Sequence, residues 1–282
     1  MPHVLEHTAR PLIKLAFKED LGDRGDITTL AIGVTDHHCS ASIIARQKGV
    51  IAGIDLLTLA FHEIDPEIDL TFAVKDGDAV RPDQLLAKIS GAADRILIAE
   101  RTALNFFGHL SGIATLTRQF VDAVAGLKTK LLDTRKTIPG WRSLEKYAVR
   151  CGGGENHRMG LYDMFLIKEN HIAAAGGLAN AVRRCRDFMR TCNFKAEIEV
   201  EAQNLQDVKD ALSLRVDRIL LDNMPLNEIA KCVEFVNYRI PLEVSGNVSL
   251  ATVRAIGETG VDYISIGALT HSAKNFDVSL LF

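Results

Sequence analysis

Residues 218–270 read RILLDNMPLNEIAKCVEFVNYRIPLEVSGNVSLATVRAIGETGVDYISIGALT, and this stretch decides the fold. Short apolar runs occur at 219–221, at 242 and 244, and at 263–266. Between them, residues 226–236 and 250–260 repeat apolar side chains with the period of an α-helix. Strands that alternate with helices in this way predict a parallel sheet.

The same alternation extends back to Lys130. Further apolar positions lie at 131–132, at 164–167 and at 198 with 200, with helical patterns at 178–189 and 205–214. An α/β barrel presents polar residues at the carboxyl ends of its strands. A doubly wound sheet does so too, but no G-x-G-x-x-G follows a first strand, which favours the barrel. The strand-end segments are 133–136, 168–171, Glu199 with Glu201, 222–223, 245–247 and Gly267.

The part of the chain before Lys130 has a less regular pattern. It predicts a helix at 5–20, a strand at 39–47 and a helix at 53–63. Two short strands are expected between 75 and 89, followed by two helices at 94–107 and 113–124. No low-complexity linker separates this part from the barrel, so we expect a tightly packed boundary.

Composition excludes several classes of protein. The formal net charge of −3 argues against a nucleic-acid-binding protein. No apolar run is long enough to cross a bilayer, and the first 20 residues lack the pattern of a signal peptide. The five cysteines contain no CxxC pair, which indicates reduced thiols and a cytoplasmic location. Cys151 lies beside a glycine run, but nothing around it marks an activated thiol, so we expect it to be inert.

Two segments are candidates for binding an anion. Arg135 and Lys136 end the first barrel strand, although a solvated surface loop would explain these charges equally well. Residues 152–158 combine three glycines, which let the backbone approach a ligand, with His157 and Arg158. An arginine fork suits a carboxylate or a phosphate, so this second segment favours a binding site. Lys168, at the next strand end, adds a further cation.

Carboxylates form a second group of candidates. Glu197, Glu199 and Glu201 are spaced by two and share one face of a strand. Burying them without partners would be costly, so they require cations, a metal or hydroxyl groups. With Asp222 on the neighbouring strand, we favour a site for Mg²⁺ and sugar hydroxyls. Salt bridges to nearby lysines and arginines are the alternative, and both arrangements can hold at once.

The last two strand ends, 245–247 and Gly267, can form a phosphate cradle from exposed backbone N–H groups. No Ser/His/Asp or Cys/His nucleophile set is apparent in the sequence. Cations, carboxylates and a phosphate cradle together suit the displacement of pyrophosphate at a sugar carbon, where positioning and charge stabilisation dominate catalysis.

On these residues the sequence resembles the quinolinate phosphoribosyltransferase family, also called carboxylating nicotinate-nucleotide pyrophosphorylase. The matching motifs follow the family's order over nearly the whole chain. They are DLGD (20–23), GDIT (25–28), ERTALNF (100–106), LSGIAT (110–115), DTRKT (133–137), KYAVR (146–150), GGGENHR (152–158), IKENH (167–171), EIEVE (197–201), LLDN (220–223), EVSGN (243–247) and VDYISIGALTH (261–271).

The resemblance implies a type II phosphoribosyltransferase fold, with an N-terminal α/β sandwich joined to an incomplete, open α/β barrel. We expect the sandwich at 1–112, completed by the tail 271–282, and the barrel at 113–270. The implied activity transfers phosphoribosyl from phosphoribosyl pyrophosphate to quinolinate and decarboxylates the product to nicotinate mononucleotide, for NAD synthesis. The implied assembly is a homodimer or higher oligomer with shared active sites.

The resemblance also implies roles for individual residues. Asn247 stands where many members have a second glycine, which matters little because the backbone N–H is the binding group. Arg101 is expected to reach the neighbouring chain's site. Glu199 and Asp222 are expected to contact the ribose and Mg²⁺, directly or through the substrate, and to act in catalysis with Lys136. The remaining expected substrate ligands are Thr134, Arg135, His157, Arg158, Lys168, Ser245, Gly246, Asn247 and Gly267.

Two rival functions remain open. A related transferase for nicotinate would share the phosphate cradle but would need fewer cations, whereas Arg135 together with the His157–Arg158 pair favours a dianionic base. A non-catalytic anion sensor would have no need for Glu199 and Asp222 beside those cations.

Overall fold

The computed structural model describes residues 3–34 and 37–282, so residues 1–2 of the expected N-terminal domain and residues 35–36 lie outside it. The chain divides into two compact units. Unit 1 comprises residues up to 118 together with 137–153 and 269–282, and unit 2 comprises 119–136 and 154–268. The segment 137–153, which we expected in the barrel, groups with unit 1, where helix α5 (Arg142–Cys151) packs against α1 (His3–Leu21).

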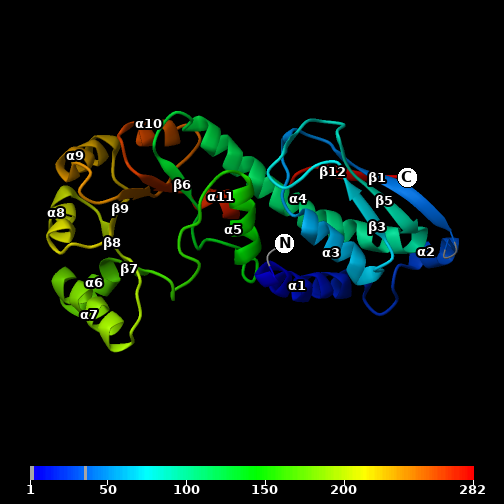
Figure 1. Ribbon diagram of the computed structural model, residues 1–282, viewed down its shortest axis with the longest axis horizontal. Coiled ribbons are helices and arrows are strands. Elements are labelled where there is room, and N and C mark those ends of the chain that lie inside the picture. The colour runs from blue at the N-terminus through cyan, green and yellow to red at the C-terminus, as the bar shows by residue number, and fades with distance from the viewer. Residues whose placement is uncertain (1–2, 35–36) are drawn as a thin grey trace. The chain divides into compact units, whose positions relative to one another are not determined.

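Unit 1 is built on an antiparallel sheet of four strands in the order β12-β1-β5-β3. Strand β12 (Val278–Leu281) runs beside β1 (His38–Ala45), so the red and blue arrows lie together in Figure 1. The remaining strands are β5 (Leu85–Ala92) and β3 (Asp69–Phe72), with β2 (Gly49–Val50) and β4 (Ala79–Val80) forming a separate pair. The further helices of this unit are α2 (Ile27–Ile32) and α3 (Ile54–Ile64), and α11 (Ala268–His271) begins at its boundary.

Helix α4 (Ala93–Ala123) corrects the prediction of two helices at 94–107 and 113–124. The helix continues through Gly108 and Gly112, because both glycines face the C-terminal segment instead of breaking the helix. A Cβ on Gly112 would lie 2.1 Å from the carbonyl oxygen of Lys274, and one on Gly108 would lie 2.9 Å from that of Phe276. The Phe276 N–H also donates to the Gly108 carbonyl at 2.8 Å. Glycine here allows two segments to pack closely.

Unit 2 confirms the predicted strands and the open α/β barrel. Its six strands pair in parallel in the order β6-β11-β10-β9-β8-β7. This is the order of a barrel that is open between its first and second strands, β6 and β7. Leu132 of β6 instead forms a parallel bridge with Glu155, which precedes β7 in the chain. The strands are β6 (Lys130–Leu132), β7 (Phe165–Ile167), β8 (Ile198–Ala202), β9 (Arg218–Asp222), β10 (Leu242–Ser245) and β11 (Tyr263–Ser265).

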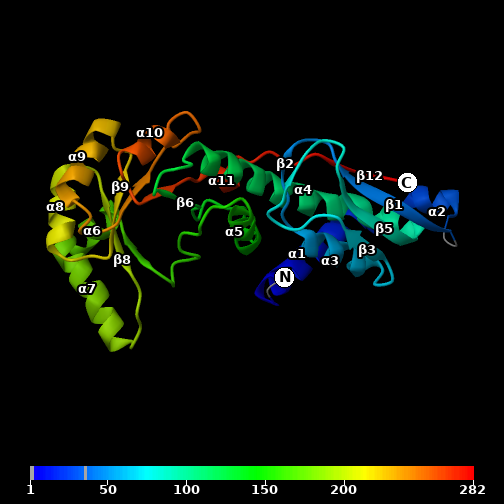
Figure 2. The same cartoon turned by 45° about the horizontal axis from the view of Figure 1, so that its top comes forward.

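Helices cover the outer face of this sheet. In both ribbon views α7, α8 and α9 lie outside β8 and β9 (Figure 1, Figure 2). The strand residues that face them, such as Ile198, Val200 and Ile219, are fully buried and apolar. None of the described helices is long and apolar enough to span a membrane. The helices of this unit are α6 (Glu169–Ala175), α7 (Leu178–Thr191), α8 (Leu205–Ser213), α9 (Leu226–Val236) and α10 (Val253–Glu258).

Candidate active site

The carboxyl ends of β9 and β10 form a polar turn of linked side chains. Asp222 accepts a hydrogen bond from the Ser245 hydroxyl at 2.7 Å and another from the Asn223 amide at 2.9 Å. Asn223, Gly246 and Asn247 all have positive φ, at 52°, 99° and 50°. Gly246 has a φ that L side chains rarely adopt, and a Cβ there would also meet the Asn223 side-chain oxygen at 2.1 Å, so this turn strongly favours glycine. Left-handed residues in succession turn backbone N–H groups toward a common side, which suits a phosphate.

A buried ionic cluster occupies the inner face of the sheet. His157 Nε2 lies 3.1 Å from a Glu199 oxygen and 3.3 Å from a Glu243 oxygen, and both carboxylate side chains are fully buried. Arg218 Nη1 donates to the other Glu243 oxygen at 3.0 Å. The backbone N–H of His157 donates to buried Asp133 at 2.9 Å. Five segments distant in sequence therefore meet through charged side chains.

The protonation of His157 depends on opposing effects. Burial disfavours the cation, but the two carboxylates outweigh it and raise the pKa of His157 to about 9. The Arg158 N–H lies 2.7 Å from Nδ1, a contact that suits a ring with its proton on Nε2. Two buried carboxylates outweigh one main-chain hydrogen bond, so we expect the cation at neutral pH.

The pKa values of the two buried carboxylates, Glu199 and Glu243, shift in opposite directions. Burial, together with the charge of Glu243, raises the pKa of Glu199. Burial alone would also raise the pKa of Glu243, but interactions with His157, Ser265 and Arg218 outweigh it and lower that pKa overall. Neither Glu199 oxygen accepts a well-directed hydrogen bond from the described residues. The interaction of Glu199 with His157 is therefore mainly ionic.

His157, Glu199 and Glu243 are the candidate metal ligands of this cluster. The ligand atoms of His157, Glu199 and Glu243 lie within 4.8 Å of one another, and they form the one such group of three found in the described residues. Arg218 already neutralises Glu243, however, so a divalent ion bound to Glu243 would lie close to the positive guanidinium of Arg218. Asp222, expected beside Mg²⁺, lies outside this group.

Lys168 and Glu201 meet at the carboxyl edge of β7 and β8. Lys168 precedes α6, is exposed, and forms an ion pair with Glu201. Glu201 lies two residues beyond Glu199 on β8 and is therefore nearer the strand end, whereas Glu199 is fully buried. Sequence reasoning noted the spacing of these glutamates but did not select Glu201.

The expected anion ligands are brought together in part. Burial and the like charge of Arg135 both lower the pKa of Arg158, so the two guanidinium groups are close enough to repel. Arg158 Nη1 donates to the Met164 carbonyl at 3.1 Å. The Thr134 hydroxyl accepts from the Lys136 N–H at 3.0 Å, which orders the backbone of the cationic loop. Two neighbouring guanidinium groups of this kind favour a dianionic ligand.

Gly267 and Arg101 are the two other expected ligands. Gly267 follows β11 and is half-buried. Arg101 is exposed on the part of α4 that belongs to unit 1. Its role toward a neighbouring chain stays a prediction.

Two charged residues of the cluster were missed by sequence reasoning. Arg218 begins β9 directly before the apolar run 219–221, and Glu243 lies between Leu242 and Val244 on β10. A charge within an apolar strand is the signal that would have identified them, because such a side chain must be paired when buried.

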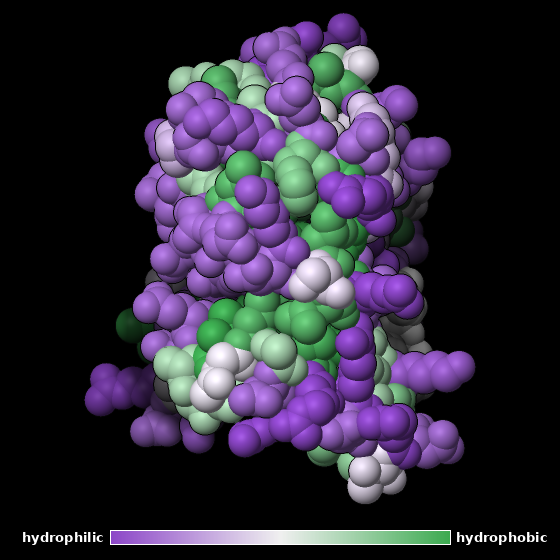
Figure 3. Space-filling view, turned by 90° about the vertical axis from the view of Figure 1, so that its left-hand side faces the viewer, coloured by the Kyte–Doolittle hydropathy of each residue, from purple (hydrophilic) through white to green (hydrophobic). Residues whose placement is uncertain are grey.

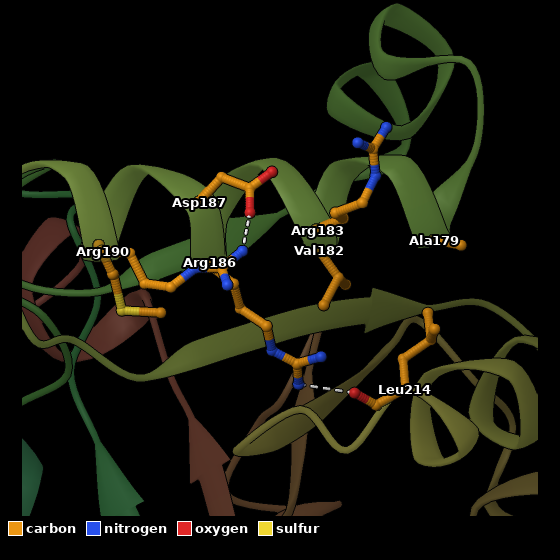
Figure 4. A pocket seen from close by; sticks show the side chains of 8 residues that line it. Ala179, Val182, Arg183, Arg186, Asp187, Arg190 and Leu214 are labelled. Atoms are coloured by element: carbon orange, nitrogen blue, oxygen red, sulfur yellow. Dashed lines mark hydrogen bonds and ion pairs between the residues drawn. The ribbon is translucent and has the colours of Figure 1, made fainter.

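A groove of about 600 Å³ on the outer helices is distinct from these strand ends. Arg183, Arg186 and Arg190 of α7 line it together with Leu214 (Figure 4). Arg186 donates to the Leu214 carbonyl at 2.7 Å, and Arg190 pairs with Asp187. Figure 3 shows this helical side as a hydrophilic surface with apolar patches, and Phe188, Leu226 and Phe235 are exposed on α7 and α9. With its cations engaged, this groove is a poorer anion site than the strand ends.

Comparisons with known proteins agree with this geometry. Residues 26–111 match the N-terminal domain of quinolinate phosphoribosyl transferase, and residues 113–281 match its C-terminal domain. The chain is 44% identical to the chloroplastic nicotinate-nucleotide pyrophosphorylase [carboxylating] of Arabidopsis thaliana, covering 96% of this chain and 82% of the relative. It is 43% identical to the mitochondrial quinolinate phosphoribosyltransferase [decarboxylating] 2b of Nicotiana tabacum, covering 96% and 81%. Among solved structures, the nicotinate-nucleotide pyrophosphorylase of Ehrlichia chaffeensis has 44% identity and a TM-score of 0.90, covering 96% and 97%.

Proposed function

The chain belongs to the quinolinate phosphoribosyltransferase family, and we propose that it transfers phosphoribosyl from phosphoribosyl pyrophosphate to quinolinate. The products are nicotinate mononucleotide, pyrophosphate and CO₂, in the synthesis of NAD. The observation that carries the proposal is the match of residues 26–111 and 113–281 to the two domains of quinolinate phosphoribosyl transferase. Arg135 and Arg158, whose like charges interact, supply two cations for the two carboxylates of quinolinate.

Substrate binding divides between two sets of residues. Arg135 and Arg158 take the quinolinate carboxylates, and Lys136 and Lys168 add positive charge for the carboxylates and the pyrophosphate. The turn of Ser245, Gly246 and Asn247, with Gly267, holds the 5-phosphate through backbone N–H groups, supported by its positive φ values. His157 and Thr134 order these loops by the hydrogen bonds described above.

Transfer requires stabilisation of a positive ribose. As the bond from C1 to the pyrophosphate oxygen breaks, positive charge develops on the sugar, and Glu199 and Asp222 stabilise it electrostatically. The pyridine nitrogen then forms the new bond to C1 and becomes cationic. The 2-carboxylate leaves as CO₂, its electron pair is stabilised by the adjacent ring nitrogen, and the ring carbon takes up a proton.

Mg²⁺ is part of this proposal. When bound with the substrate it would neutralise the departing pyrophosphate. The strand-end oxygens of Asp222 suit such an ion, which prefers oxygen ligands, whereas Glu201 is paired with Lys168. Glu199, buried against His157 and Glu243, suits a through-space role better than direct coordination.

We further propose a cytoplasmic homodimer in which Arg101 completes the partner's site. The exposed apolar residues Ile27, Leu30 and Ile32 of α2, each more than 60% exposed, support a surface for a second chain. The plant relatives above carry organelle names, so location in the cell is best tested directly by fractionation.

The function is tested by mixing the purified protein with phosphoribosyl pyrophosphate and Mg²⁺, together with either quinolinate or nicotinate. Pyrophosphate and CO₂ should be released in equal amounts with quinolinate. Pyrophosphate release with nicotinate but not quinolinate would indicate the related transferase. Binding of quinolinate without release of either product would indicate an anion sensor.

A further inference from the structure

The inner face of the open barrel is charged, whereas the inner face of an α/β barrel is usually filled with branched apolar side chains. Glu199 of β8 and Arg218 of β9 are register partners, and Glu243 of β10 pairs in register with Leu220, two residues beyond Arg218. Strand residues two apart share a face, so the three charges project to the same side of the sheet. Buried charges are costly, and this arrangement therefore calls for a functional reason.

Glu243 is the centre of this network. One of its oxygens accepts from Arg218 at 3.0 Å, and the other lies 3.3 Å from His157. Arg218 is itself held in place, because its guanidinium stacks over the Tyr263 ring with 4.4 Å to the centroid and also contacts Glu197 at 3.4 Å. Glu243 thus links a fixed cation on β9 to the His157 ring.

The position of the His157 ring in turn constrains the next residue, Arg158. The Arg158 N–H lies 2.7 Å from His157 Nδ1, so the placement of the ring constrains the backbone from which the Arg158 side chain extends. The other ring nitrogen faces Glu243 and Glu199. Both nitrogens of His157 are thus engaged within the protein.

We propose that Glu243 is a positioning residue of the quinolinate subsite, which acts through His157 on the placement of Arg158. The inference rests on the proposed function, since it concerns the same site. Glu243 would not contact either substrate. Ser245 and Asp222 bond to each other rather than to Glu243, so the phosphate turn is held independently.

The test compares Glu243→Gln with Glu197→Gln. Both carboxylates contact Arg218, but Glu197 is 60% exposed and has no contact with His157 among those described, which makes it a matched control. Glu243→Gln should raise KM for quinolinate tenfold or more and change KM for phosphoribosyl pyrophosphate less than about threefold. Glu197→Gln should leave both within about twofold. A wild-type enzyme that turns over quinolinate is the reference, so its inactivity would refute the proposed function rather than this inference.

A second variant separates positioning from folding. Glu243→Gln removes the buried charge partner of Arg218 and is therefore expected to lower thermal stability. The double variant Glu243→Gln/Arg218→Gln removes both charges together and should recover much of that stability. The quinolinate KM should stay raised in the double variant, because His157 still lacks Glu243. Recovery of that KM together with stability would overturn the inference. Equal increases in both KM values, or a Glu243→Gln enzyme that behaves like Glu197→Gln, would do so as well.

Discussion

Gly112→Ala sets two physical effects against each other in the middle of α4. Alanine is the better helix former by about 1 kcal/mol, so helix propensity alone predicts a more stable protein. The new Cβ would lie 2.1 Å from the Lys274 carbonyl oxygen and 3.3 Å from the Asn275 Cα, both of which are main-chain atoms. No side-chain rotation relieves such a contact, so the segment 274–276 must move away from the helix.

The cost of that movement exceeds the gain in propensity. Forced overpacking typically costs about 1–3 kcal/mol, and the displacement also strains the hydrogen bond from Phe276 N–H to the Gly108 carbonyl, worth about 1 kcal/mol. We therefore expect a net loss of about 2 kcal/mol in the free energy of unfolding. Hydrogen exchange at β12 should accelerate, because this strand follows the displaced segment.

The assay is urea unfolding followed by circular dichroism, with amide exchange measured on the same samples. Asn105→Ala is the matched control, because Asn105 is exposed on the same helix and its replacement should gain a few tenths of a kcal/mol. A Gly112→Ala protein as stable as the control variant, with unchanged exchange at β12, would refute the close-packing argument.

Four further predictions concern the site. Arg135→Ala or Arg158→Ala should weaken quinolinate binding by about 1–3 kcal/mol and phosphoribosyl pyrophosphate binding less, and equal losses in titration calorimetry would contradict the assignment. Mixing inactive Arg101→Ala and Lys136→Ala chains should restore about half of the sites in each heterodimer, and confirmed subunit exchange without activity would exclude a shared site. The pKa of His157 is raised from 6.5 to about 9, so the charged ring stabilises the fold fully below pH 6.5. This contribution, on the order of 3 kcal/mol, is lost as pH rises through 9. Urea unfolding measured across this pH range should show the loss, and a His157→Gln variant should lack it. Excess chelator should abolish pyrophosphate release, and full turnover in its presence would remove Mg²⁺ from the proposal.

The sequence predicted the barrel well because each strand repeats a strong local signal. The strands around Ile219, Val244 and Ile264 are apolar on the face that packs against the helices and end in polar residues, so their pattern is local in the sequence. The long helix was missed because Gly108 and Gly112 resemble a helix end in sequence. Only the approach of residues 274–276, distant in the chain, explains why they continue it.

The candidate site was predictable at its rim and not in its interior. Lys168 directly follows β7 and Asp222 ends β9, so their positions can be deduced from strand order alone. The contacts of His157 with Glu199 and Glu243 depend on how three strands stagger and on where the loop before β7 returns. Local patterns contain no information about such distances.

The pairing of β12 with β1 has a consequence for synthesis on the ribosome. Ser42 emerges early, whereas its partner Leu281 follows only after all of unit 2 has been made. Because synthesis adds about 5–20 residues per second, this edge of β1 stays unpaired for tens of seconds until β12 is made. An unpaired strand edge is a template for association between nascent chains. Chaperone protection of newly made chains should therefore matter most for residues 38–45, and unit 2, whose sheet needs no later segment, can fold first.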